Sequence, residues 1–232
     1  KCDGWNGLLV GDMSQPRGGP MLTGHASHQI GLDADIWFMP MPQKRLSYRE
    51  REFLEPVPLA NPPDTQVIGK NWRRGYVRLV ARAVSYPEVE RVFVHPAIKR
   101  ALCEATPEGE RAWLAKVRPW FGHNYHFHVR IGCPVGLDSC EGQKPVDLND
   151  DGCGKELQAW LRKVSARPKP RPAPKPKPPG WKPARPAKPM TIDDLPPDCR
   201  QVLVFDNVRY LDRAAPLAVD IALPTRNPRR RH

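Results

Sequence analysis

Apolar positions along residues 1–164 follow short periods, and this order is lost in the rest of the chain. Short apolar or alternating runs predict strands at residues 8–10, 30–38, 89–94 and 126–131. Helical spacing or charge density predicts helices at residues 47–54, 72–83, 96–102, 108–117 and 154–164. Because strands and helices mix without a regular βαβ rhythm, we predict the α+β class with a mainly antiparallel sheet.

Two of the predicted strands separate an apolar face from a polar one, because successive residues of a strand point to opposite sides. In residues 30–38 the polar face carries Asp33, Asp35 and Trp37, and the apolar face carries Leu32, Ala34, Ile36 and Phe38. In residues 126–131 the polar face carries His126, His128 and Arg130, and we expect Phe127, Val129 and Ile131 to enter the core. A strand packed on its far side gives two imidazoles the rigid support that a metal site needs.

Five of the seven histidines form two clusters, H-x-x-H at residues 25–28 and H-x-x-H-x-H at residues 123–128. Asp35 follows His28 by seven residues, so His28, Asp35 and one strand histidine offer two nitrogens and one oxygen. Three such ligands with a fourth position open to water are typical of catalytic zinc, which lowers the pKa of that water to about 7. A second strand histidine, His126, is then placed to act as a general base or to stabilise an oxyanion. The clusters predict a zinc site, whereas His95 and His232 lie outside them and are expected to be structural or incidental.

The six cysteines form no C-x-x-C pair, so a thiolate zinc site is not predicted. An even number of scattered cysteines indicates disulfides and an oxidising compartment, with free buried thiols in a reducing compartment as the alternative. Cys133 and Cys140 enclose a short polar loop and are the first candidate pair. The second candidate pair is Cys103 with Cys153, and Cys2 with Cys199 is left by elimination.

Much of the formal charge of +12 lies on residues that follow the first domain in the sequence. We divide the chain into a domain at residues 1–164, a Pro/Lys-rich linker at 165–190, and a segment at 191–232 that docks in part around Cys199 and ends in a basic tail. Alternating proline and basic residues favour extended polyproline II and build no core. The basic residues lack an aromatic stacking platform, so no nucleic-acid partner is predicted. A solvated linker is preferred over a segment that contacts anionic envelope polymers.

Two further expectations concern the N-terminus and membrane insertion. Residue 1 is Lys and leads directly into a strand-like run, so we expect the chain to be truncated at its N-terminus, with any signal peptide outside it. No apolar stretch approaches the roughly 20 residues that span a bilayer, so no membrane span is predicted.

The sequence resembles the penicillin-insensitive murein endopeptidases of Gram-negative bacteria. The resemblance covers residues 7–164, with a weaker echo at LPPDC (195–199). It is carried by GHASHQ (24–29), GLDADI (31–36), KVRPWF (116–121), the histidines at 123, 126 and 128 with Val129 and Arg130, GDM (11–13) and GCG (152–154). The family belongs to a wider group with lysostaphin-type peptidases, D-Ala-D-Ala peptidases and the hedgehog signalling domain. The resemblance therefore implies a hedgehog/D-Ala-D-Ala peptidase-like fold, with a small antiparallel sheet, surrounding helices and long loops.

The resemblance also implies a function and a set of site residues. It implies a periplasmic enzyme that cleaves the D-alanyl–meso-diaminopimelyl cross-links of peptidoglycan with a metal-activated water. The implied zinc ligands are His28, Asp35 and His128, with His25 as an outer or second-metal ligand. His126 would be the catalytic base and His123 an auxiliary base or transition-state donor. Some relatives carry an Asp and a His near the position of Asp64, but DTQV (64–67) has no histidine, so Asp64 is a weak candidate.

Two other functions remain open on sequence alone. A zinc D,D- or L,D-carboxypeptidase of peptidoglycan would use a similar set of ligands. A non-catalytic zinc-containing module that binds the cell wall would keep the ligands without hydrolysis, although the retention of His126 and His123 beside them favours an enzyme.

Overall fold

The computed structural model describes residues 5–15, 18–19 and 26–166. Five strands in this part of the chain form one sheet in the order β1-β2-β5-β3-β4. They are β1 (Leu8–Val10), β2 (Asp33–Pro40), β3 (Val89–Val94), β4 (Val117–Pro119) and β5 (His126–Ile131). Every neighbouring pair is antiparallel except β3 and β4, which are parallel. The predicted α+β class with a mainly antiparallel sheet is therefore confirmed.

Alternation along the three central strands builds the core on one face of the sheet. Ile36 and Phe38 of β2, Val92 of β3 and Phe127 of β5 are buried in one apolar cluster with residues of the helices. Asp33 and Asp35 of β2 and His126, His128 and Arg130 of β5 alternate with the apolar residues and lie on the other face. The sheet thus separates the hydrophobic core from a face that is free to carry chemistry.

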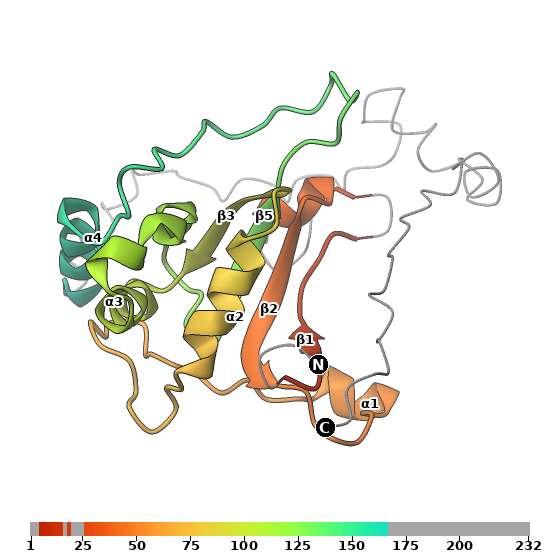
Figure 1. The fold of residues 1–232 in the computed structure, drawn as a ribbon. Coiled ribbons are helices and arrows are strands. Elements are labelled where there is room, and N and C mark those ends of the chain that lie inside the picture. Colours follow the sequence, from red (N-terminus) through yellow and green to blue (C-terminus); the bar gives the residue numbers. More distant parts are fainter. Residues whose placement is uncertain (1–4, 16–17, 20–25, 167–232) are drawn as a thin grey trace, which may run out of the picture. The chain divides into compact units, whose positions relative to one another are not determined.

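The helices are α1 (Tyr48–Glu52), α2 (Gly75–Val84), α3 (Pro96–Ala105) and α4 (Lys155–Ser165), with 3₁₀ turns η1 (Ala26–Ile30), η2 (Glu108–Glu110) and η3 (Ala112–Lys116). Figure 1 shows α2 lying across one face of the sheet, and α3 and α4 packing side by side. The amphipathic α2 buries Tyr76, Leu79, Val80 and Val84 in the core. No helix in the described ranges is long and apolar enough to span a membrane.

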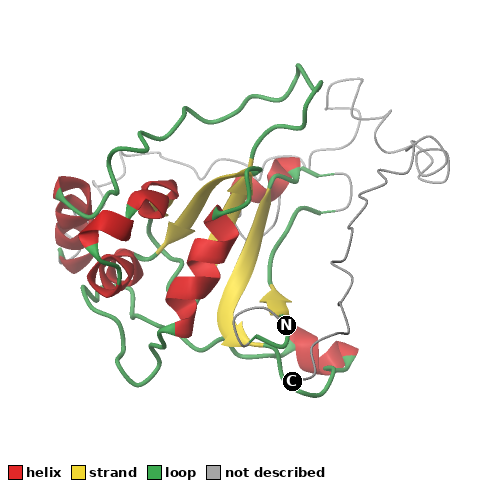
Figure 2. Cartoon of the chain, viewed as in Figure 1, coloured by secondary structure: helices red, strands yellow, loops and turns green. Residues whose placement is uncertain are grey.

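Figure 2 distinguishes the helices and strands of the described part of the chain by colour. The predicted helix at residues 108–117 is wrong, because this stretch forms the separate 3₁₀ turns η2 and η3 and then enters β4. Arg111 separates the two 3₁₀ turns, and its guanidinium donates to the carbonyl oxygens of Cys103 (2.6 Å) and Thr106 (2.8 Å) at the end of α3. Val117 then leaves the turn to pair with Val92 of β3. Tertiary hydrogen bonds therefore outweigh a helical pattern that was short and contained Gly109.

Two smaller expectations also fail at strand ends. The strand predicted at residues 30–38 begins only at Asp33, because Gly31 turns the chain with a φ of 75° and leaves Ile30 exposed at the end of η1. Ile131, which we expected to enter the core, is 39% exposed at the end of β5.

Two disulfides join parts of this fold. Cys103 of α3 is bonded to Cys153, just before α4, and Cys133 is bonded to Cys140 in the loop after β5. The sequence predicted both pairs, Cys133–Cys140 as the first candidate and Cys103–Cys153 as the second. The third candidate pair, Cys2 with Cys199, lies outside the described residues, as do the C-terminal segment and the predicted linker from residue 167 onward.

Candidate metal centre

The polar faces of β2 and β5 meet at one point of the sheet. In the antiparallel register Asp35 stands directly opposite His128, and Asp33 stands opposite Arg130. All four residues are buried. Because opposite residues of adjacent strands project to the same side, this register alone brings a carboxylate and an imidazole together.

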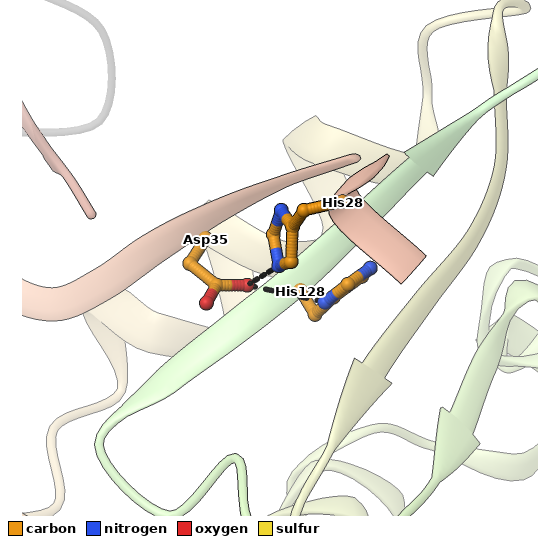
Figure 3. A group of neighbouring side chains, drawn as sticks. All are labelled: His28, Asp35 and His128. Atoms are coloured by element: carbon orange, nitrogen blue, oxygen red, sulfur yellow. Dashed lines mark ion pairs between the residues drawn. The ribbon is translucent and has the colours of Figure 1, made fainter. Parts of the chain in front are cut away.

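His28 completes the group from outside the sheet. It lies in η1, immediately before the Gly31 turn that leads into β2, and it is 1% exposed. Its Nε2 lies 3.4 Å from Oδ1 of Asp35, and Nδ1 of His128 lies 3.1 Å from the same oxygen. Figure 3 shows the two imidazoles and the carboxylate converging from η1, β2 and β5.

This arrangement fits a tetrahedral metal ion. One ligand atom from each of His28, Asp35 and His128 lies within 4.8 Å of the others, and no other such group occurs in the described residues. Two atoms bonded at about 2.0–2.1 Å to a tetrahedral zinc ion stand about 3.4 Å apart, close to the observed 3.1–3.4 Å. Two imidazoles and one carboxylate are also ligands that zinc accepts.

Asp33 contacts His128 on the ring nitrogen that faces away from Asp35, a role that we did not predict. Its Oδ1 lies 2.5 Å from Nε2 of His128 and accepts a hydrogen bond of 2.6 Å from Nε of Arg130. A carboxylate on the far nitrogen of a metal-binding imidazole fixes the tautomer and the orientation of the ring. The i, i+2 spacing of Asp33 and Asp35 placed both on one face in the sequence, but it did not reveal which imidazole nitrogen each would contact.

The electrostatics favour a cation at this point. Burial alone would raise the pKa of Asp35 and of Asp33, but hydrogen bonds from His128, and from Arg130 in the case of Asp33, lower both. Burial would lower the pKa of His128, yet the two carboxylates outweigh it and raise this pKa to about 9. The two carboxylates thus favour a positive charge at His128, and a divalent cation bound to its ring would supply that charge in place of a proton.

His126 and His123 lie beside this group. Nε2 of His126 is 3.4 Å from Oδ2 of Asp35, whereas His28 and His128 approach Oδ1 of the same carboxylate. The ring centroid of His123 is 5.0 Å from that of His126 and 5.5 Å from that of His128. His123 adopts a positive φ of 53°, which is unusual for a residue with a side chain, and it follows Gly122 with a φ of 69°.

The turn at His123 is held by defined contacts. Nδ1 of His123 lies 2.7 Å from the carbonyl oxygen of Phe121, and its own carbonyl accepts a hydrogen bond from the backbone of His95. Burial, followed by the neighbouring His126 ring, lowers the pKa of His123 to about 4. The His123 ring is therefore neutral near pH 7.

These side chains line an open cavity of about 620 Å³. His28, Asp35, His126 and His128 belong to its wall, together with the aromatic rings of Phe93, Trp120 and Phe121 and the polar side chains of Arg91 and Gln143. Trp120 and Phe121 are each 52% exposed. The cavity therefore gives a large ligand access to the candidate metal ligands along an aromatic wall.

Other predicted residues lie elsewhere. Asp64 accepts hydrogen bonds from the backbone and side-chain amides of Asn61 and is not part of the metal-ligand group. His95 caps α3, since its Nδ1 accepts from the backbone of Ala97, which fits the structural role expected of it. His25 and His232 lie outside the described residues.

Comparison with known proteins agrees with the motifs. The family model of penicillin-insensitive murein endopeptidases matches residues 1–204. The chain is 44% identical over 161 residues to the penicillin-insensitive murein endopeptidase of Haemophilus influenzae, an alignment that covers 69% of this chain and 55% of that protein. It is 42% identical over 202 residues to that of Klebsiella pneumoniae (86% and 66%), and 38% identical over 196 residues to that of Yersinia enterocolitica (84% and 64%).

The chain thus spans between about half and two thirds of the length of the curated relatives it matches. Within that span the family model includes both histidine clusters and the strands that carry the candidate ligands. This chain belongs to the penicillin-insensitive murein endopeptidase family.

Proposed function

We propose that this chain carries the active site of a zinc-dependent murein endopeptidase that hydrolyses D-alanyl–meso-diaminopimelyl cross-links in peptidoglycan. The observation that carries the proposal is the buried convergence of His28, Asp35 and His128 in an open cavity, with two more histidines beside them. Family membership supports the reaction class. The two disulfides support an oxidising compartment such as the periplasm, where peptidoglycan lies.

His28, Asp35 and His128 would hold the metal ion. A zinc ion at this point would supply Lewis acidity and lower the pKa of a bound water. Asp33 keeps Nδ1 of His128 directed toward Asp35 by contacting Nε2, and Arg130 in turn balances the charge of Asp33. The ligands are therefore oriented before any ion or substrate arrives.

His126 is the proposed catalytic base. Its Nε2 lies at the border of the ligand atoms, where it can take a proton from the attacking water and return it to the leaving amine. His123 donates from Nδ1 to the Phe121 carbonyl, so its neutral ring presents Nε2 as an acceptor. We therefore assign His123 the role of auxiliary base in preference to that of transition-state donor.

The test is the product profile of purified cross-linked peptidoglycan, read by mass spectrometry with and without a chelator. We expect dimeric muropeptides to fall to monomers, and chelation to stop this. His128→Ala should lose both the metal and the cleavage, whereas His126→Ala should keep the metal and lose about 100-fold or more in turnover.

Other outcomes would point to other functions. Release of terminal D-alanine alone would identify a carboxypeptidase. Zinc binding without any change in the muropeptides would favour a cell-wall binding module. Full cleavage by metal-free His128→Ala would refute the ligand assignment.

A further inference from the structure

Arg91 is an arginine of the cavity wall, and the candidate metal site gives it no function. It lies on β3 directly opposite Arg130, and Phe93, two residues further, lies opposite His128. Opposite residues share a face, so Arg91 projects from the same side of the sheet as the candidate metal ligands. It lines the same cavity and is half-buried.

The two neighbouring arginines differ in how their charge is balanced. Arg130 donates to the buried carboxylate of Asp33. Arg91 donates to the backbone carbonyl of Lys144, and no carboxylate pairs with it among the residues that the structure describes. Gln143, next to Lys144 in the chain, also lines the cavity, and the nitrogen of its side-chain amide is a hydrogen-bond donor that a carboxylate can accept from.

The distance from the metal ligands suits a group close to the reacting bond. Phe93 packs on His128, with ring centroids 5.6 Å apart, and Arg91 lies two residues, about 7 Å, further along the strand. An extended peptide covers about 3.5 Å per residue, so Arg91 stands within about two substrate residues of the reacting bond.

We propose that Arg91, together with Gln143, forms a subsite for the free carboxylate of the substrate residue whose amine is released. This inference rests on the proposed function. In a D-alanyl–meso-diaminopimelyl amide, the carbon attached to the scissile nitrogen carries a free carboxylate. Its two oxygens match the planar fork of a guanidinium, whereas a lysine ammonium offers only a point charge.

The test compares two soluble muropeptide dimers, one with this carboxyl group free and one with it amidated, using the zinc-loaded protein. Wild type should show a kcat/KM about 10- to 100-fold higher on the free acid, the range expected for hydrogen bonds to a charged group. Arg91→Gln should lower kcat/KM on the free acid, mainly through a higher KM, and abolish the preference. Arg91→Lys should restore it in part. Arg100→Gln, at an arginine that pairs with Glu104 on α3, is the matched control and should keep the full preference.

Two results would overturn the subsite. In one, wild type cleaves both dimers equally well. In the other, Arg91→Gln slows both dimers by the same factor, so that Arg91 serves only to tether the Lys144 segment. Failure of the proposed function looks different, because wild type would then cleave neither dimer, and the subsite would fall with it.

Discussion

At the scale of residues, the site depends on which side of a strand each side chain occupies. Asp33 and Asp35 are two residues apart on β2 and contact the two nitrogens of one imidazole on β5. A shift of one residue in either strand would turn these groups into the core, so the site and the core require the same register. Asp33 is a positioning residue, because its contact is with His128 and with Arg130.

We expect Asp33→Asn to weaken zinc binding about 10- to 100-fold, the cost typical of losing an outer carboxylate of a metal-binding histidine. Competition with a zinc chelator measures this without reference to catalysis. Asp138→Asn, in the exposed Cys133–Cys140 loop, is the matched control. Circular dichroism should verify that Asp33→Asn is folded, because the change removes the counter-charge of buried Arg130. Unchanged zinc affinity in a folded variant would contradict the assigned role.

At the scale of elements, the sheet that carries the site is supported by helices that are themselves joined covalently. The Cys103–Cys153 bond ties α3 to the segment before α4, and both helices contribute to the core under the sheet. The Cys133–Cys140 bond closes only a short loop after β5. The two bonds enclose 50 and 7 residues, respectively, so they restrict the unfolded chain to different degrees.

Removal of the two disulfides should therefore have unequal effects. From loop closure we expect Cys103→Ala/Cys153→Ala to lower the free energy of unfolding by about 4 kcal/mol, and Cys133→Ala/Cys140→Ala by about 2 kcal/mol. Urea titration of each double variant beside the wild type measures both losses. A larger loss of unfolding free energy in Cys133→Ala/Cys140→Ala than in Cys103→Ala/Cys153→Ala would contradict the loop-closure argument.

At the scale of the whole molecule, one buried lysine links several elements. Lys99 of α3 is completely buried, and its Nζ donates to the carbonyl oxygens of Leu114 in η3 (2.7 Å) and Asp151 before α4 (2.5 Å). Burial, followed by the nearby Arg118, lowers its pKa to about 7. The unfolded chain would hold this proton up to a pH of about 10.4.

This difference makes global stability depend on pH. Between about pH 7 and pH 10 the unfolded state binds the Lys99 proton and the folded state does not, so Lys99 should raise the free energy of unfolding as pH rises. We expect wild type to gain about 2–4 kcal/mol over this range relative to Lys99→Met, measured by urea unfolding of both proteins at each pH. The difference isolates Lys99 because the other titrating groups are shared. Parallel pH profiles would show that the lysine keeps its proton when buried.

Local patterns predicted most of the elements because alternation and helical spacing follow directly from burial on one side. α1 depends on local signals of another kind, since it buries no side chain and Ser47 and Glu50 form a reciprocal capping box that needs no distant partner. The predicted helix at residues 108–117 failed because its pattern competed with partners that the sequence does not display, namely the end of α3 and the edge of β3. His123 is similar, since its positive φ is held by contacts with Phe121 and His95.

The sequence by itself indicated the α+β class, the two-sided strands, the two disulfide pairs at Cys103–Cys153 and Cys133–Cys140, and the residue types of the candidate metal ligands, because periodicity and spacing along the chain express these features. Only the tertiary structure decided that Asp35 stands opposite His128, that His28 reaches them from η1, and that Asp33 contacts the far nitrogen of His128. It also placed Arg91 in the cavity wall and buried Lys99, two residue types that sequence patterns assign to the surface. The reason is physical, since strand register, burial of charge and convergence of ligands are set by contacts between residues far apart in the chain.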